Sequence, residues 1–119
     1  MKLSDSDLTR LAATAVMGWI VENSRGGQYY NDPSSDINHP WVRDWSPLTD
    51  WRAAGEIVDE MRADGWHCLT MAVSGGENLC DYYRRADDKR KTNDPRETMP
   101  RAITIAALLA LGAVTQDQV

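Results

Sequence analysis

The segment from Asp44 to Trp66, DWSPLTDWRAAGEIVDEMRADGW, constrains the fold more than any other, because it marks both ends of one helix. Thr49 is placed to act as the N-cap, with Asp50 in the first turn, where the helix dipole favours negative charge. Ser46-Pro47 is a competing start. Gly65 stands where a left-handed residue commonly ends a helix. The segment therefore predicts a helix of about 14 residues.

One side of this helix is apolar and predicts the face that it buries. Its members recur at helical spacing, and they are Trp51, Ala54, Ile57, Val58 and Met61. Trp66 follows the terminal glycine, and we expect it to pack back on Met61, a contact that often accompanies such a cap. The predicted helix is thus fixed at its ends and along its inner face.

Two more helices are expected at the ends of the chain. The first is predicted from Asp5 to Trp19, with Ser4 as its N-cap and an apolar stripe along one side. The last begins after Thr98 and runs to Gly112. It is apolar nearly all round, so it must be buried on more than one side. Either it lies in the centre of the domain, or one flank meets another subunit.

The strand pattern completes the expected fold. Residues 67–74 alternate, the Gly-rich turn at 75–77 follows, and residues 78–85 return as the second strand of a hairpin. Short extended pieces are expected at 28–30 and 41–45, and loops at 31–40 and 86–97. The order of elements predicts an α+β fold with three helices packed on a small antiparallel sheet, an α-β-α layered sandwich. One domain is expected over residues 1–119.

Three segments together resemble a known family. They are LTRLAATAVMGW (8–19), WSPLTDWRAAGEIVDEMRADGW (45–66) and MPRAITIAALLALGAV (99–114). Their order is similar to that of the phage ABA sandwich domain family of small phage and prophage proteins. In that family a helix ends in a VMGW-like motif, and an aromatic arm and a P-S/T-T-D turn lead into a helix that closes on M…GW. A hairpin and a helix of the P-A-I-x-x-A-A-L kind follow.

The resemblance spans almost the whole chain, with two departures: Leu48 stands inside the turn, and the charged segment before the last helix is longer. It implies packed helix and sheet layers and a phage or prophage origin. It carries over no catalytic residue, because the family has no general catalytic assignment. The origin favours host-directed roles, including antagonism of bacterial immunity.

The charge is unevenly distributed. The chain has a formal net charge of −5, yet residues 84–101 hold seven basic and four acidic side chains. An acidic body argues against sequence-specific DNA binding, which needs a broad basic face. The basic segment leaves room for a small anion. The polar start of the chain argues against a secretory signal. The apolar run at 102–114 is shorter than the about 20 residues that span a bilayer, so we expect a protein of the host cell cytoplasm without membrane contact.

Catalytic chemistry finds little support. His39 and His67 lie in no spacing suited to zinc, and Cys68 and Cys80 form no CxxC pair, so reduced thiols are expected. No serine has the setting of a nucleophile elbow. The sequence therefore predicts a protein that is not an enzyme and that needs neither cofactor nor metal.

The basic segment is the first binding candidate. Arginine pairs bidentately with phosphate and tyrosine can stack on a base, so this combination would suit a nucleotide such as a cyclic nucleotide. The candidate residues are Tyr82, Tyr83, Arg84, Arg85, Lys89, Arg90, Arg96 and Arg101. The alternative is a solvated loop whose charges pair locally with Asp87, Asp88 and Asp94.

Two surfaces are candidates for binding a protein. The outer face of the middle helix carries an acidic strip of Glu56, Asp59 and Glu60, which could fit a basic groove. The arm with Trp41, Arg43 and Trp45 could supply anchors. The alternatives are an ordinary solvated helix face and tryptophans that fold back over the sheet.

The sequence thus predicts a non-enzymatic phage or prophage protein that antagonises a bacterial defence system. Two mechanisms are open: sequestration of a nucleotide signal, and blocking of a host defence protein complex in the manner of an anti-CRISPR. A structural or housekeeping phage accessory protein is the alternative. The apolar last helix leads us to expect a homo-oligomer formed through it.

Overall fold

The computed structural model describes residues 2–24, 27–31, 45–73, 76–84, 89–92, 96 and 98–119. The chain begins with helix α1 (Asp5–Leu11), a π-helical turn η1 (Ala12–Val16) and the strands β1 (Ile20–Ser24) and β2 (Gly27–Asn31). Helix α2 (Trp51–Ala63) and the strands β3 (Trp66–Val73), β4 (Glu77–Arg84) and β5 (Lys89–Thr92) follow, and the chain ends with α3 (Met99–Ala110) and the 3₁₀ turn η2 (Gln116–Gln118). The predicted arm at 41–44 lies outside the described residues.

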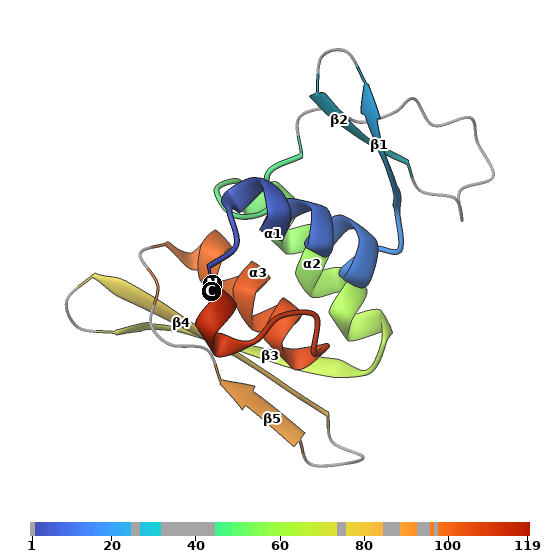
Figure 1. The fold of residues 1–119 in the computed structure, drawn as a ribbon. Helices are drawn as coiled ribbons and strands as arrows, with labels where there is room; N and C mark the ends of the chain where they lie inside the picture. The colour runs from blue at the N-terminus through green and yellow to red at the C-terminus, as the bar shows by residue number, and fades with distance from the viewer. Residues whose placement is uncertain are drawn as a thin grey trace.

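The strands form two antiparallel units. β1 pairs with β2, and β3, β4 and β5 form a three-stranded sheet in that order. α3 packs against β4 and α2 lies beside it, while η1 contacts both helices. Figure 1 shows the helices between the β1–β2 hairpin and the three-stranded sheet. The α+β class is confirmed. The sheet was expected between helices, whereas the apolar α3 takes the central position.

The predicted first helix is present, with an irregular end. Ser4 caps it: its hydroxyl accepts a hydrogen bond from the Asp7 amide at 3.1 Å, and the Asp7 side chain accepts one from the Ser4 amide in return. The helix passes into the wider η1 turn, and Gly18 ends it with a φ of 70°. The predicted N-cap is confirmed. Trp19 lies beyond the helix and packs on Trp45, with ring centroids 4.7 Å apart.

Helix α2 begins one residue later than predicted. The N-cap is Asp50, whose carboxylate accepts a hydrogen bond from the Arg52 amide at 3.2 Å. The prediction of Thr49 was wrong. Ser46 begins a turn in which its carbonyl accepts hydrogen bonds from the amides of both Thr49 and Asp50. The end is confirmed, since Gly65 has a φ of 93°. Met61 and Trp66 both belong to the hydrophobic core.

Helix α3 is the centre of the core. Nine of its 12 residues are buried, and Thr98 caps it by accepting a hydrogen bond from the Arg101 amide at 3.4 Å. The Thr104 hydroxyl donates to the Pro47 carbonyl at 2.8 Å, which ties α3 to the turn before α2. Burial inside one chain accounts for the apolar surface of α3, so the expected oligomer through this helix loses the observation that motivated it.

Two strands were not expected from the sequence. β5 lies within the charged segment that was predicted to be a loop, and its residues pair with Asp81 to Arg84 of β4. β1 follows Trp19 directly and pairs with the predicted short strand near Gln28. Both are short, and neither shows the alternation of apolar and polar residues that marks a half-buried strand. No helix within the described ranges is long and apolar enough to cross a membrane.

Candidate functional site

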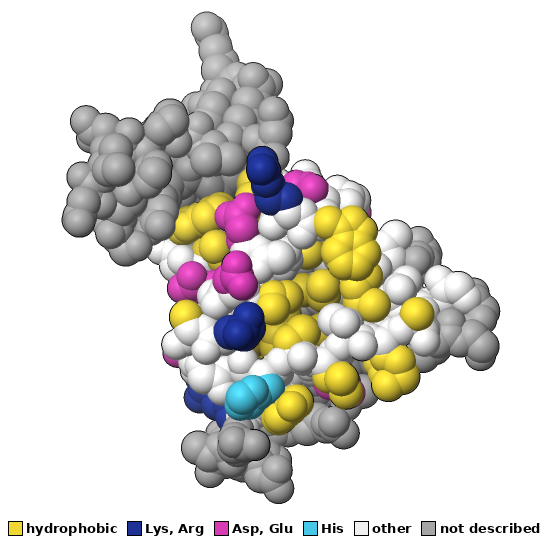
Figure 2. Space-filling model, turned by 180° about the vertical axis from the view of Figure 1, so that it is seen from behind, with side chains coloured by type: hydrophobic (Ala, Val, Ile, Leu, Met, Phe, Trp, Pro, Cys, Tyr) yellow, Lys and Arg dark blue, Asp and Glu magenta, His cyan; other side chains and the backbone are white. Residues whose placement is uncertain are grey.

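A groove of about 460 Å³ lies between α2 and β3, and we call it the α2–β3 groove. Its residues come from helices α2 and α3 and from the strands β3 and β4. They are Trp51, Val58 and Arg62 of α2, Ile103 of α3, His67, Cys68 and Thr70 of β3, and Tyr83 of β4. Figure 2 shows hydrophobic side chains gathered in the middle of one face, with acidic and basic side chains and a histidine along their border.

The register of the β3–β4 hairpin places Cys68 and Thr70 on the face of the sheet that the helices cover. Cys68 lies opposite Tyr82 and Thr70 lies opposite Cys80, and paired residues of an antiparallel sheet point to the same face. Tyr82 and Cys80 are buried under the helices. Cys68 and Thr70 therefore face the helices as well, and their position on the outer strand of the described sheet leaves them open towards the groove.

Trp51 is the most unusual side chain of this site. It was predicted to point inward, yet it is 65% exposed. It is the first residue of α2, and Arg62 lies about three turns further along the same side of the helix. The position of Trp51 on the same side of the helix as the charged Arg62 is the sequence signal that could have indicated its exposure. Gly55, one turn after Trp51, has open space where a Cβ would be, so no other side chain packs over that position.

Further exposed apolar side chains lie on β3. Leu69 and Met71 are exposed hydrophobic residues on the side of the sheet opposite to Cys68 and Thr70. Trp51 lies on the helix side of β3, so Leu69 and Met71 form a separate apolar surface on the other face of the sheet.

The acidic side chains of α2 lie away from Trp51 around the helix, with Glu60 on roughly the opposite side. Asp59 and Glu60 are exposed, and Glu56 is half-buried. Burial raises the pKa of Glu56 above its ordinary value; the neighbouring Arg52 opposes this effect, and Asp50 and Asp59 add to it. Asp59 and Glu60 thus face solvent and Glu56 does so in part, and none of the three lines the α2–β3 groove.

A pair of thiols lies at the groove: Cys68 lines it, and the buried Cys80 lies next to Cys68. The Sγ atoms of Cys68 and Cys80 are 3.5 Å apart, a distance at which one thiol can donate a hydrogen bond to the other. The two cysteines are not joined in this structure. The hydrogen bond from Cys80 lowers the pKa of Cys68, whereas the same contact and burial raise the pKa of Cys80. Cys68 is therefore the first of the two to ionise.

The predicted ligand-binding arginines point to separate partners. Arg84 forms an ion pair with Asp64 at 2.8 Å, and its guanidinium lies 4.6 Å from the centroid of the Trp66 ring. Arg101 forms an ion pair with Asp5 at 3.0 Å. Arg96 donates to the backbone oxygen of Val119 at 3.2 Å. These three guanidinium groups do not converge on one anion site.

The other members of that set have varied positions. Tyr82 is fully buried, so its ring offers no stacking surface to a base. Tyr83 stacks on His67, with ring centroids 5.2 Å apart. Lys89 and Arg90 lie on β5, opposite Arg84 and Tyr83 respectively, and Arg85 lies outside the described residues.

The aromatic arm is only partly described. Trp45 is buried against Trp19, which corrects the expectation of an exposed anchor at that position. The alternative reading, a tryptophan folded back as packing, is the one that applies to Trp45. Trp41 and Arg43 lie outside the described residues.

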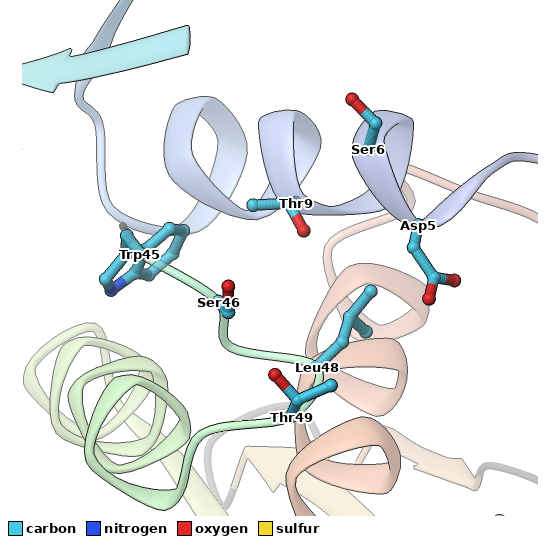
Figure 3. A pocket seen from close by; sticks show the side chains of 7 residues that line it. All are labelled: Asp5, Ser6, Thr9, Trp45, Ser46, Leu48 and Thr49. Atoms are coloured by element: carbon cyan, nitrogen blue, oxygen red, sulfur yellow. The ribbon is translucent and has the colours of Figure 1, made fainter. Parts of the chain in front are cut away.

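A second hollow, of about 240 Å³, lies between α1 and the segment that precedes α2. Figure 3 shows Thr9 and Ser46 on opposite sides of it, while Ser6 points away. The Asp5 carboxylate already binds Arg101. The hollow therefore offers hydroxyl groups and no free charge pair. Among the described residues, no three His, Cys, Asp or Glu side chains are grouped so that they could hold a metal ion.

These features define a small α+β protein whose central helix is buried and whose second helix borders an open groove. The chain belongs to the Phage ABA sandwich domain family, whose model matches residues 10–108. The matched region runs from α1 to α3 and so contains the whole α2–β3 groove. Comparisons with curated proteins and with solved structures give no match.

Proposed function

We propose that this phage-family protein is a non-enzymatic binding protein that docks the exposed face of α2 on another protein, and that its target is a component of a bacterial defence system. The observation that carries the proposal is Trp51, a large aromatic side chain exposed at the start of α2, a helix that also carries acidic side chains. The defence target rests on the phage family alone.

Trp51 has the properties of an interface anchor. Tryptophan is among the residues that most often dominate the energy of protein interfaces, because it buries a large area with few rotatable bonds. The space beside Gly55 lets a partner surface approach one side of the indole. A partner with an apolar pocket would therefore gain most of its binding energy at this one residue.

The acidic side chains of α2 indicate the charge of the partner's surface. Glu56, Asp59 and Glu60 lie along the same helix, and the chain as a whole is acidic. Complementary charge steers association and raises the on-rate more than it raises the final affinity. The partner surface should therefore be basic around its pocket. Many proteins that bind nucleic acid have such surfaces, and occupying one would block the nucleic acid.

Sequestration of a nucleotide is the weaker form of the proposal. It needs several cations at one place, and Arg84, Arg96 and Arg101 instead contact Asp64, Val119 and Asp5. Tyr82 is buried, so its ring cannot stack on a base. Docking through α2 needs no rearrangement of the described residues, so it has the better support.

The test is capture of a partner from a lysate of bacteria that carry defence systems. We expect the wild-type protein to retain a specific protein at low salt and to release it as salt is added, because exposed charges are screened. Trp51→Ala should lose the captured protein. Ile20→Ala is the matched control, since Ile20 is also an exposed apolar residue but lies on β1. Equal capture by Trp51→Ala and the wild type would contradict the proposal, as would no capture at all.

A further inference from the structure

We propose that Cys68 and Cys80 are a redox pair: a low-molecular-weight disulfide that enters the α2–β3 groove reacts at Cys68, and Cys80 then resolves the adduct to an intramolecular disulfide. This inference is independent of the docking role of α2, because it concerns the two thiols of the β3–β4 hairpin and not the exposed face of α2.

The position of the two thiols favours reaction with each other. Their Sγ atoms are 3.5 Å apart, and a disulfide bond is about 2.05 Å long, so closure needs the sulfurs to approach further, with a local movement of the two strands. The cysteines are diagonal neighbours across the β3–β4 hairpin, since Cys68 lies opposite Tyr82 and Cys80 lies opposite Thr70. Both therefore point to the same face of the sheet.

Access separates the roles of the two cysteines. Cys68 lines the groove and is partly exposed, so a small molecule can reach its sulfur. Cys80 is fully buried, and only a group already attached to Cys68 lies within its reach. Arg62 and His67 line the same groove, and the Arg62 cation would attract a disulfide that carries carboxylates, such as glutathione disulfide.

Acidity separates the roles in the same sense. The pKa of Cys68 is lowered by its hydrogen bond with Cys80, while burial and Asp81 oppose this effect. The pKa of Cys80 is raised by the same contact and by burial. Since the thiolate is the nucleophile in thiol–disulfide exchange, Cys68 is the attacking group and Cys80 keeps its proton until the second step.

The reaction balances in two steps. The Cys68 thiolate attacks one sulfur of the small disulfide, a mixed disulfide forms at Cys68, and one small thiolate leaves. The Cys80 sulfur then attacks Sγ of Cys68, the Cys68–Cys80 bond forms, and the second small thiolate leaves. The two thiolates take up the two protons that the cysteines lose. The protein is oxidised by two electrons and the small disulfide is reduced to two thiols.

The product should be readily reduced again. Diagonal neighbours on paired strands have Cα atoms roughly 7–8 Å apart, which is wider than an unstrained disulfide allows. Closing the bond therefore draws β3 and β4 together locally. Strained disulfides have higher reduction potentials and are the labile ones, so the pair is suited to reversible oxidation.

The experiment follows the intact mass of the folded protein in excess glutathione disulfide. The wild type should lose two hydrogens, with the Cys68–Cys80 crosslink found by peptide mapping, and dithiothreitol should reverse the change. Cys80→Ala should stop at one glutathione adduct on Cys68. Cys68→Ala should react at Cys80 at least about tenfold more slowly than Cys80→Ala reacts at Cys68, because the buried thiol is inaccessible.

Three results would overturn the proposal: a wild-type protein that ends as a stable glutathione adduct, a crosslink that joins two chains, or a Cys68→Ala variant that reacts as fast as Cys80→Ala. Far-ultraviolet circular dichroism identifies any variant that fails to fold. The wild-type measurement needs no substitution, so it decides whether the intramolecular disulfide forms even if both variants unfold.

Discussion

Helices α2 and α3 are nearly equal in length, with 13 and 12 residues, but they relate to solvent in opposite ways. α3 is buried along most of its surface, so its apolar side chains are satisfied within the chain. α2 buries only Ala53, Ala54, Ile57 and Met61, and its first residue is left exposed. The difference teaches that the apolar surface of α3 is needed for folding, whereas the exposed tryptophan of α2 is not.

The largest effect should come from the centre of α3. Ile105 is fully buried, and Ile105→Ala should lower the free energy of unfolding by about 2–5 kcal/mol, because a cavity is left in the core. Trp51→Ala should lower it by less than about 1 kcal/mol, as is usual for an exposed position. Urea denaturation of both variants gives the comparison. Similar losses for the two would remove the distinction between the helices.

The next effect concerns the link between the two helices. Thr104→Val removes the hydroxyl that donates to the Pro47 carbonyl and leaves that buried acceptor unpaired. We expect a loss of about 1–3 kcal/mol in the free energy of unfolding. Thr104→Ser keeps the hydroxyl and serves as the control. If the valine variant is as stable as the wild type, the hydrogen bond does not hold α3 against the turn.

The start of α2 gives a smaller effect that tests the corrected cap. Asp50→Ala should destabilise the protein by about 1 kcal/mol, because the Arg52 amide loses its acceptor. Thr49→Ala should change the stability much less. Thermal unfolding of the two variants separates them, and the reverse order would restore Thr49 as the cap.

The sequence predicted best where its signals are local. Ser4, Gly65 and Thr98 were placed correctly because capping depends on a few neighbouring residues. The hairpin of β3 and β4 was found from alternation and from the turn between its strands. These signals sufficed for the α+β class and for membership of the family.

What was missed depends on contacts distant in the sequence. β5 has few apolar residues, and only its pairing with β4 makes it a strand. Trp51 fits the apolar stripe by its residue type, and only the packing of α2 against α3 and β3 leaves it outside. The candidate arginines are close in sequence, but Arg84 and Arg101 are drawn to Asp64 and Asp5, so sequence proximity did not predict a common site.

The smallest effect concerns the acidic strip. The pKa of Glu56 is raised above its ordinary value of 4.5 by burial, so the folded protein holds this proton more tightly than the unfolded chain does. The wild type should therefore lose stability as the pH rises from about 4.5 through the folded pKa. Glu56→Gln should lack this component. Urea titrations from pH 4 to pH 7 measure the difference, and a gain of wild-type stability over the variant with rising pH would contradict it.

The most direct test pairs stability with binding at Trp51. Once a partner is isolated, its affinity for the wild type, Trp51→Ala and Ile20→Ala can be measured by calorimetry beside the free energy of unfolding of each. We predict that Trp51→Ala loses about 2 kcal/mol or more of binding, roughly thirty-fold in Kd, while it folds as stably as the control. A Trp51→Ala variant that binds as well as the wild type would contradict the account, as would one that loses affinity only because it unfolds.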